Sequence, residues 1–155
     1  MAENSVDKVY SNLLLEQYKI YVEMTDRVSA RRIDASKVYS SLLTAILVVV
    51  PFAIGTNTPP DVQKLVFLLM AFMGIALNIL WIINVNSYRQ LNSLKFQVIH
   101  EMERELPFAC YSREWQILQD KKGNRNYVRL SRVERYVPLL LLVPYLVLLV
   151  MTLTR

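Results

Sequence analysis

The stretch LVFLLMAFMGIALNILWIINVNSY, residues 65–88, contains no charged side chain. Two further charge-free runs, residues 38–60 and 136–154, stand on either side of it. A helix needs about 20 mainly apolar residues to cross the hydrocarbon core of a bilayer. The three runs therefore predict an all-α membrane protein with three transmembrane helices, over residues 38–55, 65–88 and 131–155.

Basic residues are distributed unevenly around these runs. Of the 18 Lys and Arg residues, six precede the first run and ten lie between the second and the third, whereas the loop of residues 56–64 and the carboxyl end hold one each. Cytoplasmic flanks of spanning helices are enriched in Lys and Arg. We therefore expect the amino terminus to be cytoplasmic and the carboxyl terminus to be external. The first 26 residues lack the pattern of a removable signal peptide.

The cytoplasmic flanks lack helix breakers. Residues 1–50 contain neither Gly nor Pro, and between Pro60 and Pro107 the only such residue is Gly74. Apolar residues recur at helical spacing along both flanks. The first two spans are therefore predicted to continue as cytosolic arms, residues 1–37 and 89–130, the latter including a returning segment. Because the external loop is short, the arms should form an antiparallel hairpin.

The returning segment and the third span carry their own boundary signals. Pro107 should end the second arm, and residues 111–119 can form a short helix. Ser131 and Glu134 have the spacing of a capping box at the start of the third span. Pro144 predicts a kink within that span.

The predicted hairpin leaves the outer part of the first arm without a partner. With the two arms in register at the membrane surface, Leu106 would lie near Lys19 or Ile20. An amphipathic helix with an uncovered apolar face is not stable in water. The returning segment, a neighbouring subunit or both must cover it, so we expect a homo-oligomer. The predicted packing and interface residues are Leu13, Leu14, Tyr18, Tyr21, Leu91, Leu94, Val98, Tyr111 and Trp115.

Polar residues within the spans suggest packing rather than transport. No ionisable side chain that could serve a coupled transporter lies in the charge-free runs. Asn78, Asn84 and Asn86 do not share one helical face, which favours helix packing over pore lining. We predict polar packing at Ser41, Thr44 and Asn78, with the third span facing lipid. Predicted contacts with inner-leaflet lipids are Arg31, Arg32, Lys37, Arg89 and Lys95.

Signals for catalysis and for ligand binding are weak. The sequence HEMER at His100 lacks the second His of a zinc-protease helix, because Arg104 stands in its place. Cys110 is the single cysteine, and the three glycines are too dispersed for a phosphate-binding loop. No basic cluster is interleaved with stacking aromatics. We expect no enzyme activity, no metal or cofactor, and no nucleic-acid partner.

Two segments carry a resemblance to a known family. WIINVNSYRQLNSLKFQVIHEMERELPFACYSREW at residues 81–115 and YKIYVEMTDRVSARR at residues 18–32 resemble the RipA-type family of small bacterial membrane proteins, which are described as octameric. The resemblance implies a homo-oligomeric ring, an octamer, in the bacterial inner membrane, with a cytosolic helical layer. More distantly, the chain is similar to two-span effectors encoded beside nucleotide-signalling defence systems, although it has a third predicted span and no fused sensing domain.

The leading functional hypothesis from the sequence is a scaffold or regulator that acts through its cytosolic helices. The alternative is a gated pore, or a membrane-disrupting effector of a bacterial stress or phage-defence system. Expected partners are further copies of the chain and membrane lipids. The sequence points to no particular second protein.

Overall fold

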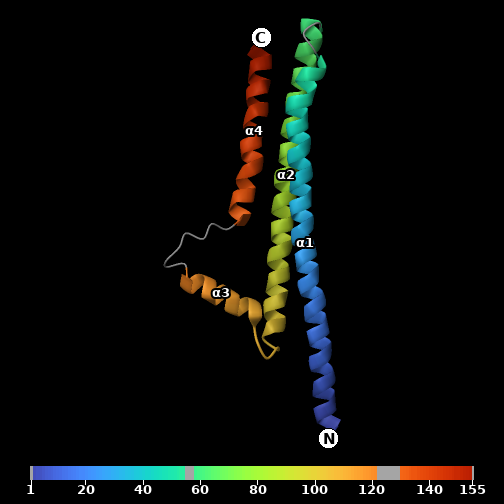
Figure 1. Ribbon diagram of the computed structural model, residues 1–155, viewed down its shortest axis with the longest axis vertical. Helices are drawn as coiled ribbons and strands as arrows, with labels where there is room; N and C mark the ends of the chain where they lie inside the picture. Colours follow the sequence, from blue (N-terminus) through green and yellow to red (C-terminus); the bar gives the residue numbers. More distant parts are fainter. Residues whose placement is uncertain (1, 55–57, 122–129, 155) are drawn as a thin grey trace. The chain divides into compact units, whose positions relative to one another are not determined.

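The computed structural model describes the backbone of residues 2–54, 58–121 and 130–154, and within these ranges the side chains of residues 8–49, 51–52, 58–120, 134 and 136–154. The described residues form four helices and no strand, which confirms the predicted all-α class. Figure 1 shows these helices, α1 (Ala2–Ile54), α2 (Pro60–Glu103), α3 (Cys110–Lys121) and α4 (Leu130–Thr154).

The chain divides into two compact units. Residues 1–31 and 88–128 form one, which we call the arm unit, and residues 32–87 and 129–155 form the other, the span unit. Helices α1 and α2 run without a break through the points of division, at 31/32 and 87/88. These points lie close to the boundaries 37/38 and 88/89 that the charge pattern predicts.

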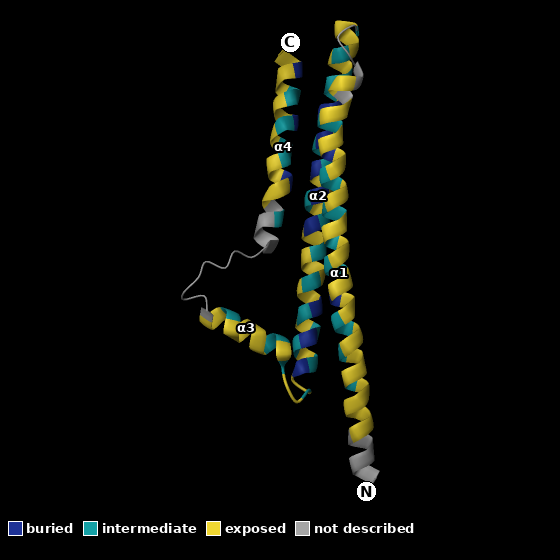
Figure 2. Ribbon diagram, in the orientation of Figure 1, coloured by how far each residue is buried: buried dark blue, intermediate teal, exposed yellow. Residues whose placement is uncertain are grey.

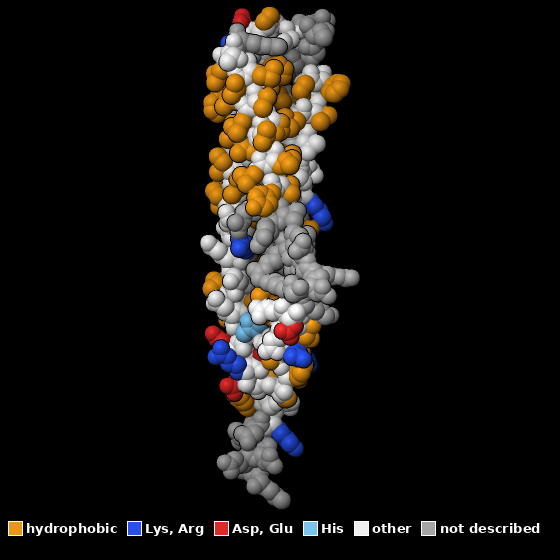
Figure 3. Space-filling view, turned by 90° about the vertical axis from the view of Figure 1, so that its left-hand side faces the viewer, with side chains coloured by type: hydrophobic (Ala, Val, Ile, Leu, Met, Phe, Trp, Pro, Cys, Tyr) orange, Lys and Arg blue, Asp and Glu red, His pale blue; other side chains and the backbone are white. Residues whose placement is uncertain are grey.

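Among the described residues, two helices are long and apolar enough to cross a membrane, α2 and the Tyr136–Thr154 part of α4. The sequence predicted three spans, so the count of candidate spans is corrected to two. The first predicted span, residues 38–55, includes residues 50 and 53–55, whose side chains are not described. The described part of this apolar run of α1 is therefore too short to count as a membrane span. On the face shown in Figure 3, hydrophobic side chains cover much of the span unit, while charged ones gather on the arm unit.

In the arm unit, α2 ends at Glu103 rather than at Pro107, where the sequence predicted the end of the arm. Hydrogen bonds from Arg104 N to Glu101 O and from Leu106 N to Glu103 O tighten the chain after the last turn. Helix α3 then begins at Cys110 and extends beyond the predicted 111–119 segment at both ends. The chain therefore leaves the arm about one turn earlier than the proline signal indicates.

The arm parts of α1 and α2 pack along one face of each helix. Thr25, Ile99 and Glu103 are buried between the elements of this unit. The Asn92 amide donates to the Ser29 hydroxyl at 3.1 Å, and Tyr18 donates to Glu103 at 3.2 Å. Tyr18 thus lies level with Glu103, a register about one turn from the prediction that placed Leu106 near Lys19 or Ile20.

In the span unit, the three helices share a small core. Leu43 of α1, Trp81 and Val85 of α2, and Tyr145 of α4 are its buried members. Figure 2 shows that buried stretches are few and lie among intermediate and exposed ones. Tyr39 stacks on Trp81 with ring centroids 6.1 Å apart. The prediction that the third span faces only lipid is therefore wrong, because Tyr145 is fully buried in this core.

Candidate functional site

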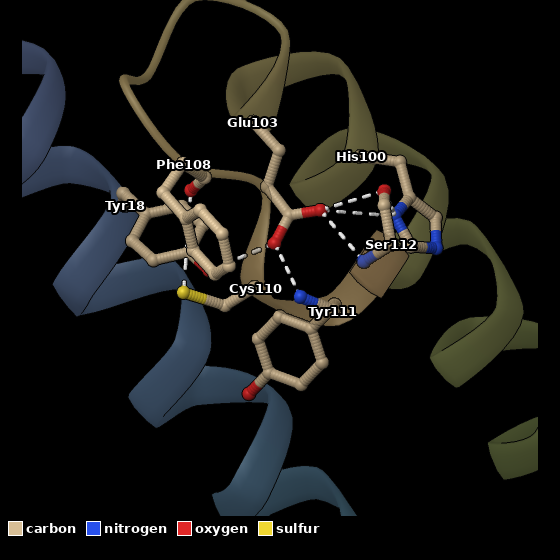
Figure 4. A network of polar contacts seen from close by, with 7 residues as sticks. All are labelled: Tyr18, His100, Glu103, Phe108, Cys110, Tyr111 and Ser112. Carbon is tan, nitrogen blue, oxygen red and sulfur yellow. Dashed lines mark hydrogen bonds and ion pairs between the residues drawn. The ribbon is translucent and has the colours of Figure 1, made fainter. Parts of the chain in front are cut away.

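The most connected polar cluster in the described chain is centred on Glu103, and we call it the Glu103 joint (Tyr18, His100, Glu103, Tyr111 and Ser112). Its residues come from α1, α2 and α3 of the arm unit, and Figure 4 shows them converging on one carboxylate. The Glu103 side chain is only 1% exposed. The joint lies beyond the charge-free run of residues 65–88, so it belongs to the part of the chain predicted to lie in water.

The Glu103 carboxylate caps the first turn of α3. The backbone N–H of Tyr111 donates to Oε1 at 2.6 Å, and that of Ser112 donates to Oε2 at 3.1 Å. The Ser112 hydroxyl adds a bond of 2.9 Å to Oε2. The first N–H groups of a helix have no partner within it, and an anion at this end is favoured by the helix dipole. One side chain thus fixes where α2 stops and how α3 starts.

The same contacts set the protonation states in the joint. Burial by itself would raise the pKa of Glu103, but the hydrogen bonds from Tyr111, Ser112 and His100 outweigh it and hold that pKa below its ordinary value. Burial, together with the Glu103 charge and the hydrogen bond to it, raises the pKa of the Tyr18 phenol. Glu103 is therefore a charged acceptor, and Tyr18 is a neutral donor.

His100 and Ser112 lie close to the Glu103 carboxylate, but they do not have the geometry of a Ser-His-carboxylate catalytic triad. His100 Nδ1 lies 3.0 Å from Ser112 Oγ and 3.3 Å from Glu103 Oε2. A serine nucleophile needs a histidine that contacts the serine with one ring nitrogen and the carboxylate with the other. Here one nitrogen faces both groups, while the serine hydroxyl donates to the carboxylate. The geometry ties α2 to α3 and does not activate the hydroxyl.

No metal centre is formed within the described residues, where no group of three or more His, Cys, Asp or Glu side chains comes together. Cys110 is exposed, and its Sγ lies 4.0 Å from the Phe108 carbonyl oxygen. The described part of the chain thus offers no clear centre for covalent or metal chemistry.

A second contact, in the span unit, holds α4. The Tyr145 hydroxyl donates to the Leu43 carbonyl at 2.6 Å. Its ring lies directly against Gly74, so that a Cβ atom at Gly74 would overlap it. We call this contact the Tyr145 seat. Asn78 lies one turn from Gly74 and donates to its carbonyl at 2.9 Å.

The three residues predicted for polar packing in the membrane have different environments. Asn78 is fully buried, but its amide donates within its own helix. Ser41 and Thr44 are exposed and line a shallow depression on α1 with Ala45 and Val48. Within one copy of the chain, Ser41 and Thr44 therefore lie on the exposed surface of α1 and do not pack between helices.

The predicted packing and interface residues fall into two sets. Five are partly buried within the arm unit, namely Leu14, Tyr18, Tyr21, Val98 and Tyr111. Tyr111 meets Phe96 edge-on, with ring centroids 5.6 Å apart. The other four are exposed, and these are Leu13, Leu91, Leu94 and Trp115.

The residues predicted to contact lipid head groups also fall into two sets, one exposed and one paired with protein groups. Arg31, Lys37 and Arg89 are exposed. Arg32 instead forms an ion pair of 3.3 Å with Glu134, both side chains being largely covered. Lys95 is 8% exposed, and its ammonium group lies 4.8 Å from the centre of the Tyr21 ring. Arg32 and Lys95 thus turn toward the protein, where a carboxylate and an aromatic face partner the two cations.

The sequence analysis did not identify Glu103, Gly74 or Tyr145, the three residues at the centre of the Glu103 joint and the Tyr145 seat. Glu103 lies in the charged sequence HEMER, and its position just before a break and a short helix is where a capping carboxylate would stand. Gly74 is the only glycine of its span, and Tyr145 lies in the middle of an otherwise Leu- and Val-rich run. A glycine within a span is a signal for close helix contact.

Comparison with known proteins adds one finding. Residues 15–154 match the family described as the octameric membrane protein family, 8xMP. No curated protein and no solved structure matches the chain. The match agrees with the octameric membrane character that the resemblance implied, and it does not extend to the RipA name.

Proposed function

The chain belongs to the octameric membrane protein family, and we propose that it is a homo-octameric scaffold or regulator of the bacterial inner membrane. The amino terminus and the arm unit lie in the cytosol, and the carboxyl terminus lies outside. Exposed Arg31, Lys37 and Arg89 face anionic lipid, where each gains about 1 kcal/mol.

The observation that carries the proposal is the way the arm unit is built. A simple membrane anchor needs no ordered body beyond its spans. Here α1, α2 and α3 converge on the buried Glu103 carboxylate, which accepts bonds from all three elements. Leaving such a charge without partners would cost several kcal/mol, so the joint holds the three helices in one arrangement. A fixed cytosolic layer, repeated around an octamer, is a platform on which other molecules can be positioned or sensed.

The chemistry of the joint supports a structural role over an enzymatic one. Its carboxylate is occupied by hydrogen-bond donors, and its serine hydroxyl is committed to that carboxylate. Its histidine faces both groups through one nitrogen. We therefore propose that the protein is not an enzyme and requires no cofactor.

Electrical recording of the purified oligomer in planar bilayers tests the proposal. A scaffold should leave the bilayer conductance at its background level across a range of voltages. Reproducible unitary currents would overturn the scaffold and favour a gated pore. A Glu103→Ala preparation is the matched control, because currents that require an intact cytosolic joint would show the arm unit to be a gate.

The mass of the particle tests the assembly separately. Native mass spectrometry in detergent should give eight chains, as the family's description implies. A monomer that stays folded would remove the basis for a repeated cytosolic layer.

A further inference from the structure

We propose that one side of the arm hairpin is the contact between neighbouring copies, and that the side carrying α3 is not. This contact surface, which we call the hairpin stripe, consists of Ile20 and Met24 on α1 and of Leu91 and Leu94 on α2. The inference rests on the proposed octamer and adds the surface through which its cytosolic layer is formed.

Helix α2 has two opposite faces in the arm unit. Phe96, His100 and Glu103 follow one another at helical spacing, and all three contact residues of α3. Leu91 and Leu94 lie nearly half a turn around the helix from them. These two leucines are 43% and 58% exposed. Helix α3 therefore covers one face of α2 and leaves an apolar face open.

Helix α1 likewise has one face packed against another helix and one exposed apolar face. Tyr18, Tyr21 and Thr25 face α2, as their contacts with Glu103 and Lys95 and the burial of Thr25 indicate. Ile20 and Met24 lie about a third of a turn away and are 56% and 45% exposed. Viewed from one end of the hairpin, successive residues advance around two antiparallel helices in opposite senses. The exposed face of α1 therefore lies on the same side of the hairpin as the open face of α2. The four side chains therefore form one continuous strip.

Lipid and α3 do not cover this strip. It lies outside the charge-free runs, on the segments predicted to be cytosolic, and α3 packs on the other side. Four large apolar side chains on one water-facing strip mark a contact surface.

Charges near the strip favour another copy over a strongly charged partner. Glu16 pairs with Lys19 at 3.2 Å, and Glu23 pairs with Arg27 at 2.6 Å, so this part of α1 is locally neutral. A strongly basic or acidic partner would find little complementary charge here. A second copy is present by necessity in an octameric family. Because the membrane gives every copy the same polarity, neighbours in a ring are related by rotation about the membrane normal, so the hairpin stripe of one copy meets a different face of the next.

Cysteine accessibility in the assembled protein tests the proposal. In a Cys110→Ser background, Met24→Cys and Leu94→Cys place thiols on the hairpin stripe. Ile117→Cys places a control thiol on α3, where Ile117 is 40% exposed, close to the 45% of Met24. In the intact octamer we expect a water-soluble maleimide to label the stripe thiols about tenfold or more slowly than Ile117→Cys, and at similar rates after dissociation in denaturing detergent.

Each outcome decides the matter. Slow labelling of both stripe thiols together with fast labelling of Ile117→Cys, in particles of octameric mass, supports the contact. Equal protection of Ile117→Cys would overturn the claim that the side carrying α3 is not part of it. Stripe thiols that react as fast as Ile117→Cys in such particles would overturn it and leave the octamer intact as a proposal. Particles that are not octameric before labelling would refute the proposed function itself.

A charge placed on the strip gives an independent measurement. Leu94→Glu should convert the octamer to smaller species, whereas Ile117→Glu should leave its mass unchanged. Circular dichroism of both variants checks that helix content is retained. An octamer that survives Leu94→Glu with its helices intact would contradict the contact.

Discussion

The arm unit and the span unit each fasten a third helix to the α1–α2 pair, but they do so with opposite chemistry. In the arm unit, α3 is held by a buried carboxylate that accepts its first backbone N–H groups. In the span unit, α4 is held by an aromatic ring seated on Gly74, with one hydroxyl bond to the Leu43 carbonyl. A charge fixes one helix, and close packing fixes the other.

The difference follows from the solvent proposed for each unit. In water, the exposed end of a short helix is stabilised by an anion at its amino terminus, and α3, Cys110–Lys121, is too short to be stable alone. In lipid, apolar burial does not drive helices together, so packing against small residues and occasional hydrogen bonds must do so. The comparison therefore predicts that polar changes damage the arm unit most, and that changes of volume damage the span unit most.

Glu103→Ala should have the largest effect. It removes the acceptor for the Tyr111 and Ser112 N–H groups and for the Tyr18 hydroxyl, and leaves these donors without that partner. We expect a loss of about 3–5 kcal/mol in the free energy of unfolding of the arm unit. Hydrogen exchange of the α3 amides should accelerate accordingly, while that of α4 should not change.

Glu105→Ala is the matched control, because Glu105 is exposed two residues further along the chain. It should change the stability by less than about 0.5 kcal/mol. An arm unit that tolerates Glu103→Ala as well as Glu105→Ala would remove the contrast between the two units.

Gly74→Ala should have the next largest effect, in the span unit. The added methyl group would overlap the Tyr145 ring and force α4 from its seat. Overpacking of this kind costs about 1–3 kcal/mol, which detergent-induced unfolding can measure. Ala76→Val, at an exposed position of the same helix, is the volume control and should be nearly silent.

A second substitution separates overlap from a general loss of helix packing. If the ring is the obstacle, Tyr145→Ala should remove most of the additional cost of Gly74→Ala, because the methyl group then meets no ring. Additive losses in the double variant would show that Gly74 is required for some other reason.

The sequence predicts the elements well because their signals are local. The absence of Gly and Pro from residues 1–50 correctly indicates one long helix, and the charge-free runs place α2 and the apolar part of α4. The predicted number of three spans was wrong for a different reason. The described apolar run of α1 ends before it reaches the length of a full span. The early end of α2 could not be seen, because it depends on a carboxylate meeting the start of the next helix.

The Tyr145–Leu43 bond and the Tyr18–Glu103 bond were missed because they join residues far apart in the chain. Tyr145 and Leu43 are 102 positions apart, and Tyr18 and Glu103 are 85 apart. Helical periodicity identifies which face of a helix is apolar, but not which of several apolar or polar partners it meets. Lys95 shows the same limit, because a lysine near a membrane boundary suggests lipid until the Tyr21 ring is found beneath it.

Tyr145→Phe should have a smaller effect than either preceding change. It keeps the ring on Gly74 and removes only the hydroxyl bond to the Leu43 carbonyl. Hydrogen bonds between membrane helices are worth about 0.6–2 kcal/mol, so we expect a loss near 1 kcal/mol. Tyr136→Phe, at a position 59% exposed, is the control. A loss as large as that of Gly74→Ala would mean that the bond, rather than the packing, holds α4.

Acid should have the smallest effect, and in the arm unit it should act through Glu103. The folded pKa of Glu103 lies below its ordinary value of 4.5, so the stability from its ionised form is complete above that value and is lost as the pH falls through the folded pKa. Exchange of the Tyr111 and Ser112 amides, corrected for intrinsic rates, should therefore accelerate only below about pH 4.5. Glu103→Gln should abolish this step, and a step that persists in that variant would assign it to another carboxylate.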